Sequence, residues 1–327
     1  MNHSRVCIVG AGRMGEGMAT AFIFAGMDVT LIDFKAREQD AAQVYFDQAR
    51  ANVQAELQIL VSLGNIAPEQ VEQALTHLRI CGRDAALADL GRSDWVFEAV
   101  PEVMEAKSQC FSWLSEHCSR QTVIASTTST FLVTELAQLV ECPQRFVNAH
   151  WLNPALLMPL VEVSCSAETD DGVLARLMQL LRDIGKVPVK CGPTAGYIVP
   201  RIQALAMNEA ARMVEEGVAS AEDIDTAIRV GFGLRFSVLG LLEFIDWGGG
   251  DILLYASRYL AGAIDPRFTA PQVISDNMAQ RRSGLRDRQG FYDYAAVDIP
   301  AYRLQRLREL SSRLELMGLM PGFGCAR

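Results

Sequence analysis

The sequence predicts an α/β protein: a doubly wound N-terminal sheet domain followed by a mainly α-helical C-terminal domain. Short apolar runs such as Val6–Val9 alternate with helical stretches over residues 1–191, as expected for strands buried on both faces of a sheet. A glycine-rich turn directly follows the first of these runs. From residue 192 to residue 327 the apolar spacing is helical almost throughout. We therefore predict two domains, residues 1–191 and residues 192–327.

The strands of the first domain are predicted from apolar runs bounded by glycine, proline or polar residues. They are Val6–Val9, Val29–Ile32, Trp95–Ala99, Val123–Ser126, Phe146–Asn148, Leu160–Ser164 and Val187–Lys190. The helices between them are predicted from apolar spacings near three and four residues. They are Met14–Ala25, Ala41–Leu63, a helix that begins at Ala67-Pro68-Glu69, and Val173–Ile184. Residues 36–78 are thus predicted to form a long helical excursion.

The composition narrows the classes of partner. The chain has 327 residues, of which 50% are hydrophobic, and a formal net charge of −9. Because an acidic surface repels phosphate backbones, we expect no nucleic-acid partner. No run approaches the roughly 18 uninterrupted apolar residues of a membrane helix, and the first apolar run is too short for a signal peptide. We therefore expect no membrane partner and a cytoplasmic location.

The cysteines and histidines follow no metal-binding pattern. The 8 cysteines form no C-x-x-C pair, and the 4 histidines are widely separated. Neither set matches the ligand spacing of a zinc or haem site. Cys7 lies within the first predicted strand. We expect reduced, mostly buried thiols and no bound metal.

The turn Gly10-Ala11-Gly12-Arg13-Met14-Gly15 has the G-x-G-x-x-G spacing of a Rossmann-type dinucleotide site. In such a turn the first glycine permits a tight bend and the second lets the backbone approach a pyrophosphate. The third glycine allows the following helix to pack closely on the strand. That helix starts near Arg13 and Met14, where free N–H groups and the positive end of the helix dipole favour phosphate.

Asp33 lies at the end of the second predicted strand. An acid at this place accepts hydrogen bonds from the adenosine ribose hydroxyls and disfavours a 2′-phosphate. The expected cofactor is therefore NAD rather than NADP, although Lys35 and Arg37 lie close enough in sequence to temper the preference. FAD uses the same type of turn and is the alternative.

His150 and Glu162 form the candidate catalytic pair. His150 is predicted to follow the strand Phe146–Asn148, at the carboxyl edge where doubly wound sheets bind their ligands. Glu162 lies in an apolar strand, where a carboxylate needs a partner. An imidazole can be that partner, and the carboxylate then fixes its tautomer and raises its basicity.

Five separate segments, in order along nearly the whole chain, resemble the 3-hydroxyacyl-CoA dehydrogenase family. The resemblance implies an NAD-dependent oxidation of a secondary alcohol, with His150 as the base and Glu162 as its partner. The segments are the turn Gly10–Gly15; Glu98-Ala99-Val100-Pro101-Glu102 with Lys107; Ala125–Thr130; His150, Asn153-Pro154 and Glu162; and Gly290-Phe291-Tyr292-Asp293-Tyr294.

The resemblance also implies roles for residues around this pair. Ser129 falls at the position of an active-site serine that hydrogen-bonds the substrate oxygen. Glu102 and Asn153 correspond to residues that shape the nicotinamide pocket, and Lys107 to a lysine on the cofactor side. Ala99 and Val100 belong to the same cofactor-binding segment as Glu102.

Three features depart from the acyl-CoA members of the family. Pro200 stands where the family has a substrate-contacting asparagine, so that side-chain contact is lost. Residues 41–82 contain no lysine, and their arginines are Arg50 and Arg79, which is little charge for the phosphates of coenzyme A. The segment Gly231–Phe236 resembles relatives that oxidise free hydroxy acids, such as carnitine and gulonate dehydrogenases. Arg235 in that segment could pair with a substrate carboxylate.

Three functions follow from these features. The first is oxidation of a short-chain 3-hydroxyacyl-CoA, similar to 3-hydroxybutyryl-CoA. The second is the same chemistry on a free 3-hydroxy acid whose carboxylate binds Arg235. The third is a structural protein resembling lambda-crystallin that binds NAD without turnover. We also expect a homodimer through apolar helix faces of the C-terminal domain that carry Leu239, Leu241, Leu242 and Phe244.

Overall fold

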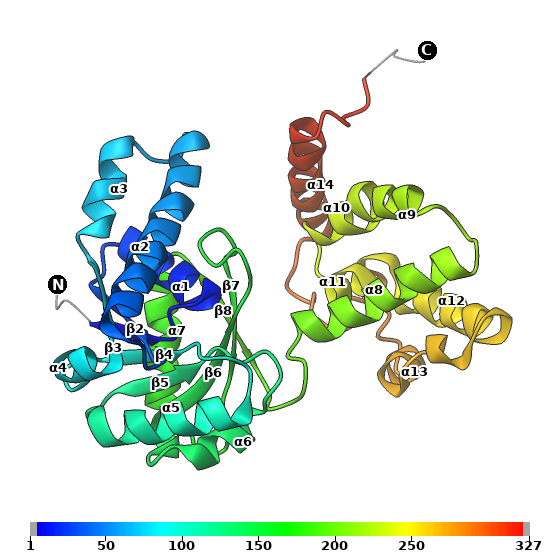
Figure 1. Cartoon of the computed structure of the whole chain (residues 1–327). Coiled ribbons are helices and arrows are strands. Elements are labelled where there is room, and N and C mark those ends of the chain that lie inside the picture. The colour runs from blue at the N-terminus through cyan, green and yellow to red at the C-terminus, as the bar shows by residue number, and fades with distance from the viewer. Residues whose placement is uncertain (1–4, 323–327) are drawn as a thin grey trace. The chain divides into compact units, whose positions relative to one another are not determined.

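The computed structural model describes residues 5–322. It consists of two compact units that divide along the chain between Ala206 and Met207, and Figure 1 follows the chain through both. The predicted boundary after Cys191 falls at the end of the last strand, whereas the two units divide later, inside helix α8 (Val199–Glu215). Among the described residues, no helix is both long and apolar enough to cross a membrane.

The N-terminal unit is built on an eight-stranded sheet with the order β3-β2-β1-β4-β5-β6-β7-β8. The first six strands are mutually parallel, which confirms the predicted doubly wound α/β fold. The strand order reverses beside β1, where such sheets bind their ligands. The strands are β1 Val6–Val9, β2 Val29–Asp33, β3 Leu78–Gly82, β4 Trp95–Glu98, β5 Val123–Ser126, β6 Phe146–Trp151, β7 Leu160–Ser164 and β8 Val187–Cys191.

Two features of the sheet differ from the sequence prediction. Strand β3 was not predicted. Only its first residue, Leu78, falls in the helical excursion 36–78, and residues 79–82 were assigned to no element because Arg79 interrupts the apolar run; β3 is an edge strand and only partly buried. Strand β7 runs antiparallel to β6, and β8 follows the direction of β7. The connection 152–159 is too short for the crossover of a dozen or more residues that a parallel pair requires.

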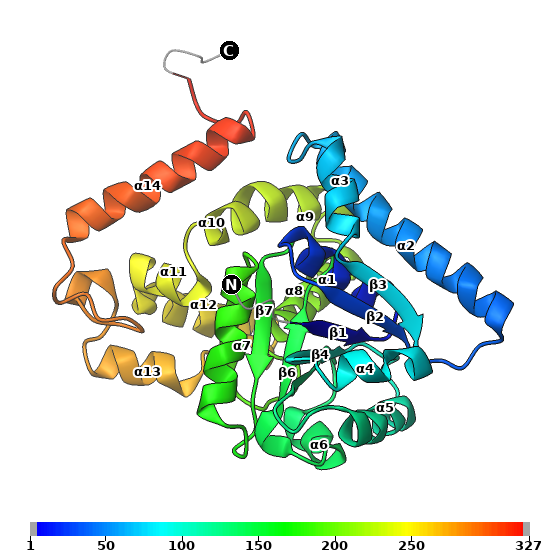
Figure 2. The same cartoon turned by 90° about the vertical axis from the view of Figure 1, so that its left-hand side faces the viewer.

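Two hydrophobic cores cover the two faces of the sheet because successive strand residues point to opposite sides. Val6 and Ile8 belong to the core packed by α1, α2, α3 and α7, whereas Cys7 and Val9 belong to the core packed by α4, α5 and α6. Figure 2 shows the sheet with its helices from a second direction. The helices are α1 Arg13–Phe24, α2 Gln39–Ser62, α3 Pro68–Leu75, α4 Leu87–Leu90, α5 Met104–His117, α6 Val133–Leu136 and α7 Asp171–Asp183.

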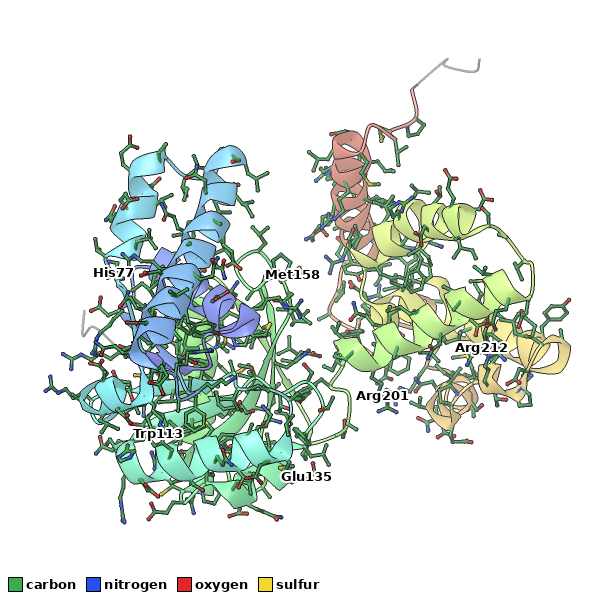
Figure 3. All side chains as sticks on the ribbon, viewed as in Figure 1. His77, Trp113, Glu135, Met158, Arg201 and Arg212 are labelled. Carbon is green, nitrogen blue, oxygen red and sulfur yellow. The ribbon has the colours of Figure 1, made fainter. Side chains whose placement is uncertain are left out.

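The C-terminal unit is helical, as predicted. The turns of residues 281–294 are held by the buried Asp246, whose carboxylate accepts hydrogen bonds from the N–H groups of Phe291 and Tyr292 at 3.0 and 2.9 Å. No residue of α8 is buried in the described structure, and Figure 3 shows its side chains, with Arg201 and Arg212 labelled. The remaining helices are α9 Ala221–Ala227, α10 Leu234–Phe236, α11 Leu241–Gly248, α12 Gly250–Ala263, α13 Gln272–Ala279 and α14 Ile299–Leu316.

Short helical turns complete both units. In residues 5–322, five are 3₁₀ turns, and Ile228–Gly233 is a π-helical turn that joins α9 to α10. The π-helical turn contains the first half of the segment Gly231–Phe236, and Arg235 lies in the second half, in α10. The 3₁₀ turns are Arg83–Ala86, Ala137–Leu139, Pro143–Arg145, Pro266–Phe268 and Leu285–Asp287.

Candidate active site

A cleft of about 780 Å³ opens at the carboxyl ends of β1 and β4 in the N-terminal unit. This is the place where a doubly wound sheet of this strand order binds a dinucleotide. The predicted cofactor residues that line the cleft come from the glycine turn, the end of β2 and the segment after β4. They are Gly10, Gly12, Arg13, Met14, Asp33, Ala99, Val100 and Glu102.

The glycine turn is shaped by close backbone contacts. Gly10 has a φ of +112°, and a Cβ atom built there would overlap the carbonyl group of Ala99. A Cβ atom on Gly15 would overlap the carbonyl oxygen of Gly10, so the start of α1 packs directly on the turn. Nothing lies within 4 Å of a Cβ atom on Gly12, whose surroundings are the open cleft. These three glycines therefore fit a bound pyrophosphate.

The part of the cleft that lies at the carboxyl end of β2 carries charges of both signs. Arg37 Nε donates to Asp33 Oδ2 at 2.5 Å, and the Lys35 N–H donates to Asp33 Oδ1 at 3.2 Å. The hydrogen bond to Asp33 raises the pKa of Arg37. The Arg37 guanidinium also lies 3.8 Å from the ring centre of Tyr45. Both oxygens of Asp33 therefore already accept a hydrogen bond from a neighbouring residue that lines the cleft.

His150 and Glu162 face each other across the antiparallel strands β6 and β7. His150 Nδ1 lies 3.0 Å from Glu162 Oε2, and the two residues are 5% and 0% exposed. The prediction that His150 follows its strand is wrong. Strand β6 extends to Trp151 because β7 folds back beside it and pairs with its last residues.

The other oxygen of Glu162 is bound by the backbone at the start of α8. The N–H groups of Ile198 and Val199 both donate to Glu162 Oε1 at 2.8 Å. The carboxylate therefore accepts bonds at both oxygens, which stabilises its negative charge in a buried place. Because an ionised carboxylate only accepts, His150 Nδ1 carries the proton and Nε2 is left to accept one. Among residues 5–322, no side chain or backbone group bonds to Nε2.

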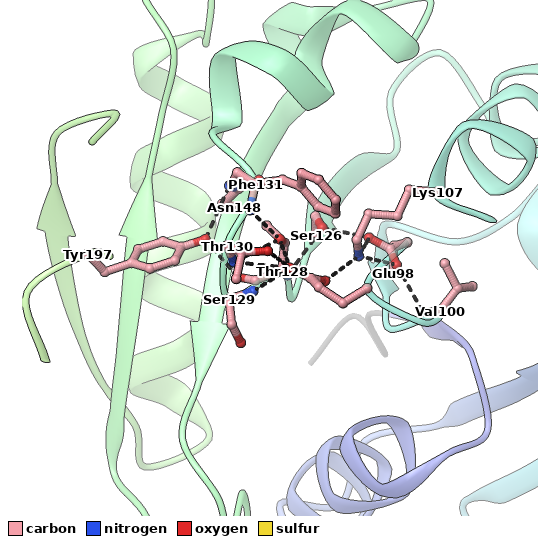
Figure 4. Close-up of polar contacts among 11 residues, drawn as sticks. Glu98, Val100, Lys107, Ser126, Thr128, Ser129, Thr130, Phe131, Asn148 and Tyr197 are labelled. Carbon is pink, nitrogen blue, oxygen red and sulfur yellow. Dashed lines mark hydrogen bonds and ion pairs between the residues drawn. The ribbon is translucent and has the colours of Figure 1, made fainter. Parts of the chain in front are cut away.

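Lys107, Glu98 and Ser126 form a buried polar network, which Figure 4 shows. Lys107 Nζ donates to both oxygens of Glu98, at 3.0 and 3.1 Å, and Ser126 Oγ donates to Glu98 Oε2 at 2.5 Å. Burial raises the pKa of Glu98, and the Lys107 charge opposes that effect. The Nζ atom of Lys107 also lies 3.2 Å from Glu102 Oε2. Lys107 is fully buried and is therefore not among the residues lining the cleft.

Glu102 organises the turn that carries Ser129. Its Oε1 accepts the N–H groups of Ser129 and Thr130 at 3.0 Å each and the hydroxyl groups of Thr128 and Thr130. Burial opposes ionisation, but these hydrogen bonds and Lys107 outweigh it and lower the pKa of Glu102 to about 2. Ser129 lines the cleft, and in Figure 4 its side chain points away from the hydrogen bonds on its backbone.

Tyr197 is a site residue that sequence reasoning missed. Its ring stacks on the His150 imidazole, with ring centres 4.7 Å apart and an angle of 13° between the planes. Its hydroxyl donates to the Thr128 carbonyl at 2.7 Å. The signal in the sequence was an aromatic residue in an isolated turn, Gly196-Tyr197, which does not show that the ring reaches two other segments.

Two predicted residues make none of the contacts described above. Asn153 is exposed, joined to Pro154 by a cis peptide bond, and not among the residues lining the cleft. Arg235 belongs to the C-terminal unit, where it lines a cavity of about 110 Å³. The roles suggested for both residues stay predictions.

Comparison with known proteins agrees with this geometry. The NAD-binding domain model of 3-hydroxyacyl-CoA dehydrogenase matches residues 5–194, and the C-terminal domain model of the same family matches residues 196–294. The chain belongs to the 3-hydroxyacyl-CoA dehydrogenase family. It is therefore an NAD-dependent oxidoreductase, as predicted, and the cleft described above fits NAD.

Relatives with different substrates resemble this dehydrogenase to a similar degree. A 3-hydroxybutyryl-CoA dehydrogenase of Clostridioides difficile is 31% identical over 89% of this chain and 99% of its own length. A 5-formyl-3-hydroxy-2-methylpyridine 4-carboxylate 5-dehydrogenase of Mesorhizobium japonicum is 27% identical over 93% of this chain and 95% of its own. The crystal structure of a 3-hydroxyacyl-CoA dehydrogenase from Archaeoglobus fulgidus is 28% identical, covers 97% of this chain and 100% of its own, and has a TM-score of 0.76.

The open space at Gly12 gives a test of the cofactor site. We expect Gly12→Ala to weaken NAD binding at least about tenfold, because the added methyl group occupies the space a pyrophosphate needs. The melting temperature should stay unchanged, since nothing in the protein meets that methyl group. Titration calorimetry and thermal unfolding measure the two effects. Gly91→Ala, outside the cleft, is the control, and unchanged NAD affinity in Gly12→Ala would contradict the assignment.

The lowered pKa of Glu102 gives a pH-dependent test of the Ser129 turn. A carboxylate whose pKa falls on folding stabilises the protein above its unfolded pKa, near 4.5, and this contribution is lost as the pH falls toward 2. We therefore expect Glu102→Gln to be less stable than the wild type at pH 7, with the difference shrinking below pH 4.5. Urea unfolding at several pH values measures it. Glu72→Gln, on an exposed face of α3, is the control; a constant difference would contradict the role of Glu102.

Proposed function

We propose that the protein oxidises the 3-hydroxyl group of a short-chain 3-hydroxyacyl-CoA, similar to 3-hydroxybutyryl-CoA, to the 3-oxo product. The observation that carries this proposal is the buried pair of His150 and Glu162, held at 3.0 Å within the unit that contains the cofactor cleft. The names of several relatives, which include 3-hydroxybutyryl-CoA dehydrogenases, support the substrate class.

His150 acts as the general base in this proposal. Its Nε2 accepts the proton of the substrate hydroxyl while Nδ1–H remains bonded to Glu162, so the ring becomes a cation paired with a carboxylate. The N–H groups of Ile198 and Val199 hold the other oxygen of Glu162 and keep its carboxylate oriented during this change. When bound, NAD supplies the hydride acceptor. Ser129 donates a hydrogen bond to the substrate oxygen and holds it toward His150.

An alternative substrate is a free 3-hydroxy acid, and two observations favour it. The arginines of residues 41–82 are already engaged: Arg50 donates to the carbonyls of Leu75 and Leu78, and Arg79 pairs with Asp89. This region therefore offers little free positive charge to coenzyme A phosphates. A relative of comparable similarity acts, by its name, on a pyridine carboxylate.

Arg235 is the residue proposed to bind the carboxylate of such an acid. Its Nε donates to the Gly231 carbonyl at 3.1 Å, and its guanidinium lies 5.3 Å from the ring centre of Phe244. Among the described residues, its two terminal nitrogens make no hydrogen bond. A guanidinium held by its Nε and an aromatic face can present both terminal N–H groups to a carboxylate.

A homodimer through the C-terminal unit is also proposed. Leu241 and Leu242 are 36% and 47% exposed at the start of α11, so they are available to a second copy. Leu239, expected on the same face, is buried and is therefore not available to a second copy. A contiguous patch of exposed apolar side chains can serve as an interaction site. Sedimentation velocity that finds a monomer at micromolar concentration would contradict the proposal.

His150→Ala tests the proposed base. We expect kcat for 3-hydroxybutyryl-CoA to fall by about 10²–10⁴-fold while NAD binding is retained, because a general base typically contributes that factor. NADH formation measures turnover, and titration calorimetry measures NAD affinity. His117→Ala, in the last turn of α5 where the side chain is partly exposed, is the control. Near-normal turnover by His150→Ala would remove His150 from the mechanism. No turnover by the wild type on any hydroxy substrate would favour the NAD-binding structural role.

Arg235→Met separates the two substrate classes. If a free 3-hydroxy acid is the substrate, its KM should rise by about tenfold to a hundredfold, since a charge-assisted hydrogen-bonded pair contributes about 1.5–3 kcal/mol. The KM for 3-hydroxybutyryl-CoA should stay nearly the same. NADH formation over a panel of acyl-CoA and free-acid substrates measures both values. Arg229→Met is the control, because Arg229 is exposed on the same helical segment; equal changes in both variants would contradict the role of Arg235.

A further inference from the structure

Tyr197 occupies an unusual backbone position between the sheet and α8. It has a φ of +46°, a left-handed conformation that residues with a bulky side chain rarely adopt, and it is only 6% exposed. The turn is fixed on both sides: Gly196 before it has a φ of +80°, and the next two N–H groups bind Glu162. The surrounding contacts therefore hold the Tyr197 side chain in one direction.

The Tyr197 ring covers one face of the imidazole of His150. The two planes are nearly parallel and their centres are 4.7 Å apart. Glu162 holds the imidazole at Nδ1, which still leaves the ring free to turn about that hydrogen bond. A flat aromatic neighbour removes that freedom, because rotation of the imidazole would collide with the phenol ring.

The Tyr197 hydroxyl reaches the segment that carries Ser129. It donates to the Thr128 carbonyl at 2.7 Å and accepts from Asn148 Nδ2 at 3.2 Å. The Thr128 carbonyl and the Ser129 N–H belong to the same peptide group, and the Ser129 N–H donates to Glu102 at 3.0 Å. This peptide group is therefore bound at both edges, by Tyr197 and by Glu102, and its plane fixes the direction of the Ser129 side chain.

We propose that Tyr197 is a positioning residue that aligns His150 and Ser129 on the same substrate hydroxyl, its ring holding the imidazole and its hydroxyl holding the Ser129 peptide. The inference rests on the proposed function, because it assumes that both residues act on one oxygen. Tyr197 transfers no proton itself. Its hydroxyl already donates to a carbonyl, and burial raises its pKa, so it stays neutral while His150 accepts the proton.

A double-mutant cycle tests this alignment. We expect Tyr197→Phe, which keeps the ring and loses the hydroxyl, to lower kcat about tenfold without changing NAD affinity. In a Ser129→Ala background the same substitution should lower kcat less than about twofold, because its effect passes through Ser129. Tyr197→Leu should lower kcat further in both backgrounds, since it also releases His150. Equal effects of Tyr197→Phe with and without Ser129 would overturn the proposal.

Tyr294→Phe is the matched control for loss of a buried hydroxyl. Tyr294 is also buried, and its hydroxyl lies 3.2 Å from Asp246 in the C-terminal unit. If Tyr197 acted only through general stability, both variants would lower kcat to a similar extent and their effects would follow their melting temperatures. The proposal expects a fall in kcat for Tyr197→Phe alone.

A spectroscopic measurement tests the peptide contact without turnover. The sequence Thr-Ser occurs once in the chain, at Thr128-Ser129, so carbonyl-labelled threonine combined with nitrogen-labelled serine gives one NMR resonance for this peptide group. We expect that resonance to shift in Tyr197→Phe and to stay in place in Tyr294→Phe. An unchanged resonance in Tyr197→Phe would overturn the contact. Absence of wild-type turnover would overturn the proposed function and would leave this measurement interpretable.

Discussion

The buried carboxylate of Glu162 is the constraint on which the arrangement of the site depends. A fully buried negative charge is tolerated only if other groups compensate it. Here the compensation comes from three directions at once: the imidazole on the neighbouring strand and the two N–H groups at the start of α8. These hydrogen bonds fix the position of each donor. The groups that compensate the Glu162 charge therefore also orient the imidazole of His150 and hold the start of α8 in place.

The parts of the site that are local in sequence could be predicted from the sequence. The turn Gly10–Gly15 needs only a strand before it and a helix after it, and its glycines are where the backbone demands them. The pairing of His150 with Glu162 was also predictable, because a carboxylate in an apolar strand requires a partner. The family resemblance added Ser129, Glu102 and Lys107, and it predicted the membership that the comparisons confirm.

The parts that depend on long-range packing could not be predicted. Because β7 runs antiparallel to β6 and pairs with its last residues, His150 lies inside a strand. The residues of β6 alone do not indicate this pairing with β7. The contacts of Tyr197 require a left-handed turn and two segments distant in sequence, so the local pattern shows only an aromatic residue after a glycine. Strand β3 was missed because an edge strand with a charged residue lacks the continuous apolar run of a central strand.

The position of the turn Gly196–Val199 matters when the two domains are exchanged between related enzymes. The family's two domain models divide at residues 194–196, yet the groups that bind Glu162 and cover His150 come immediately after that division. A chimaera joined at this domain boundary would take its glycine turn from one parent enzyme. It would take the residues that hold Glu162 and stack on His150 from the other. Recombination would therefore preserve the chemistry more readily at a crossover point downstream of Val199.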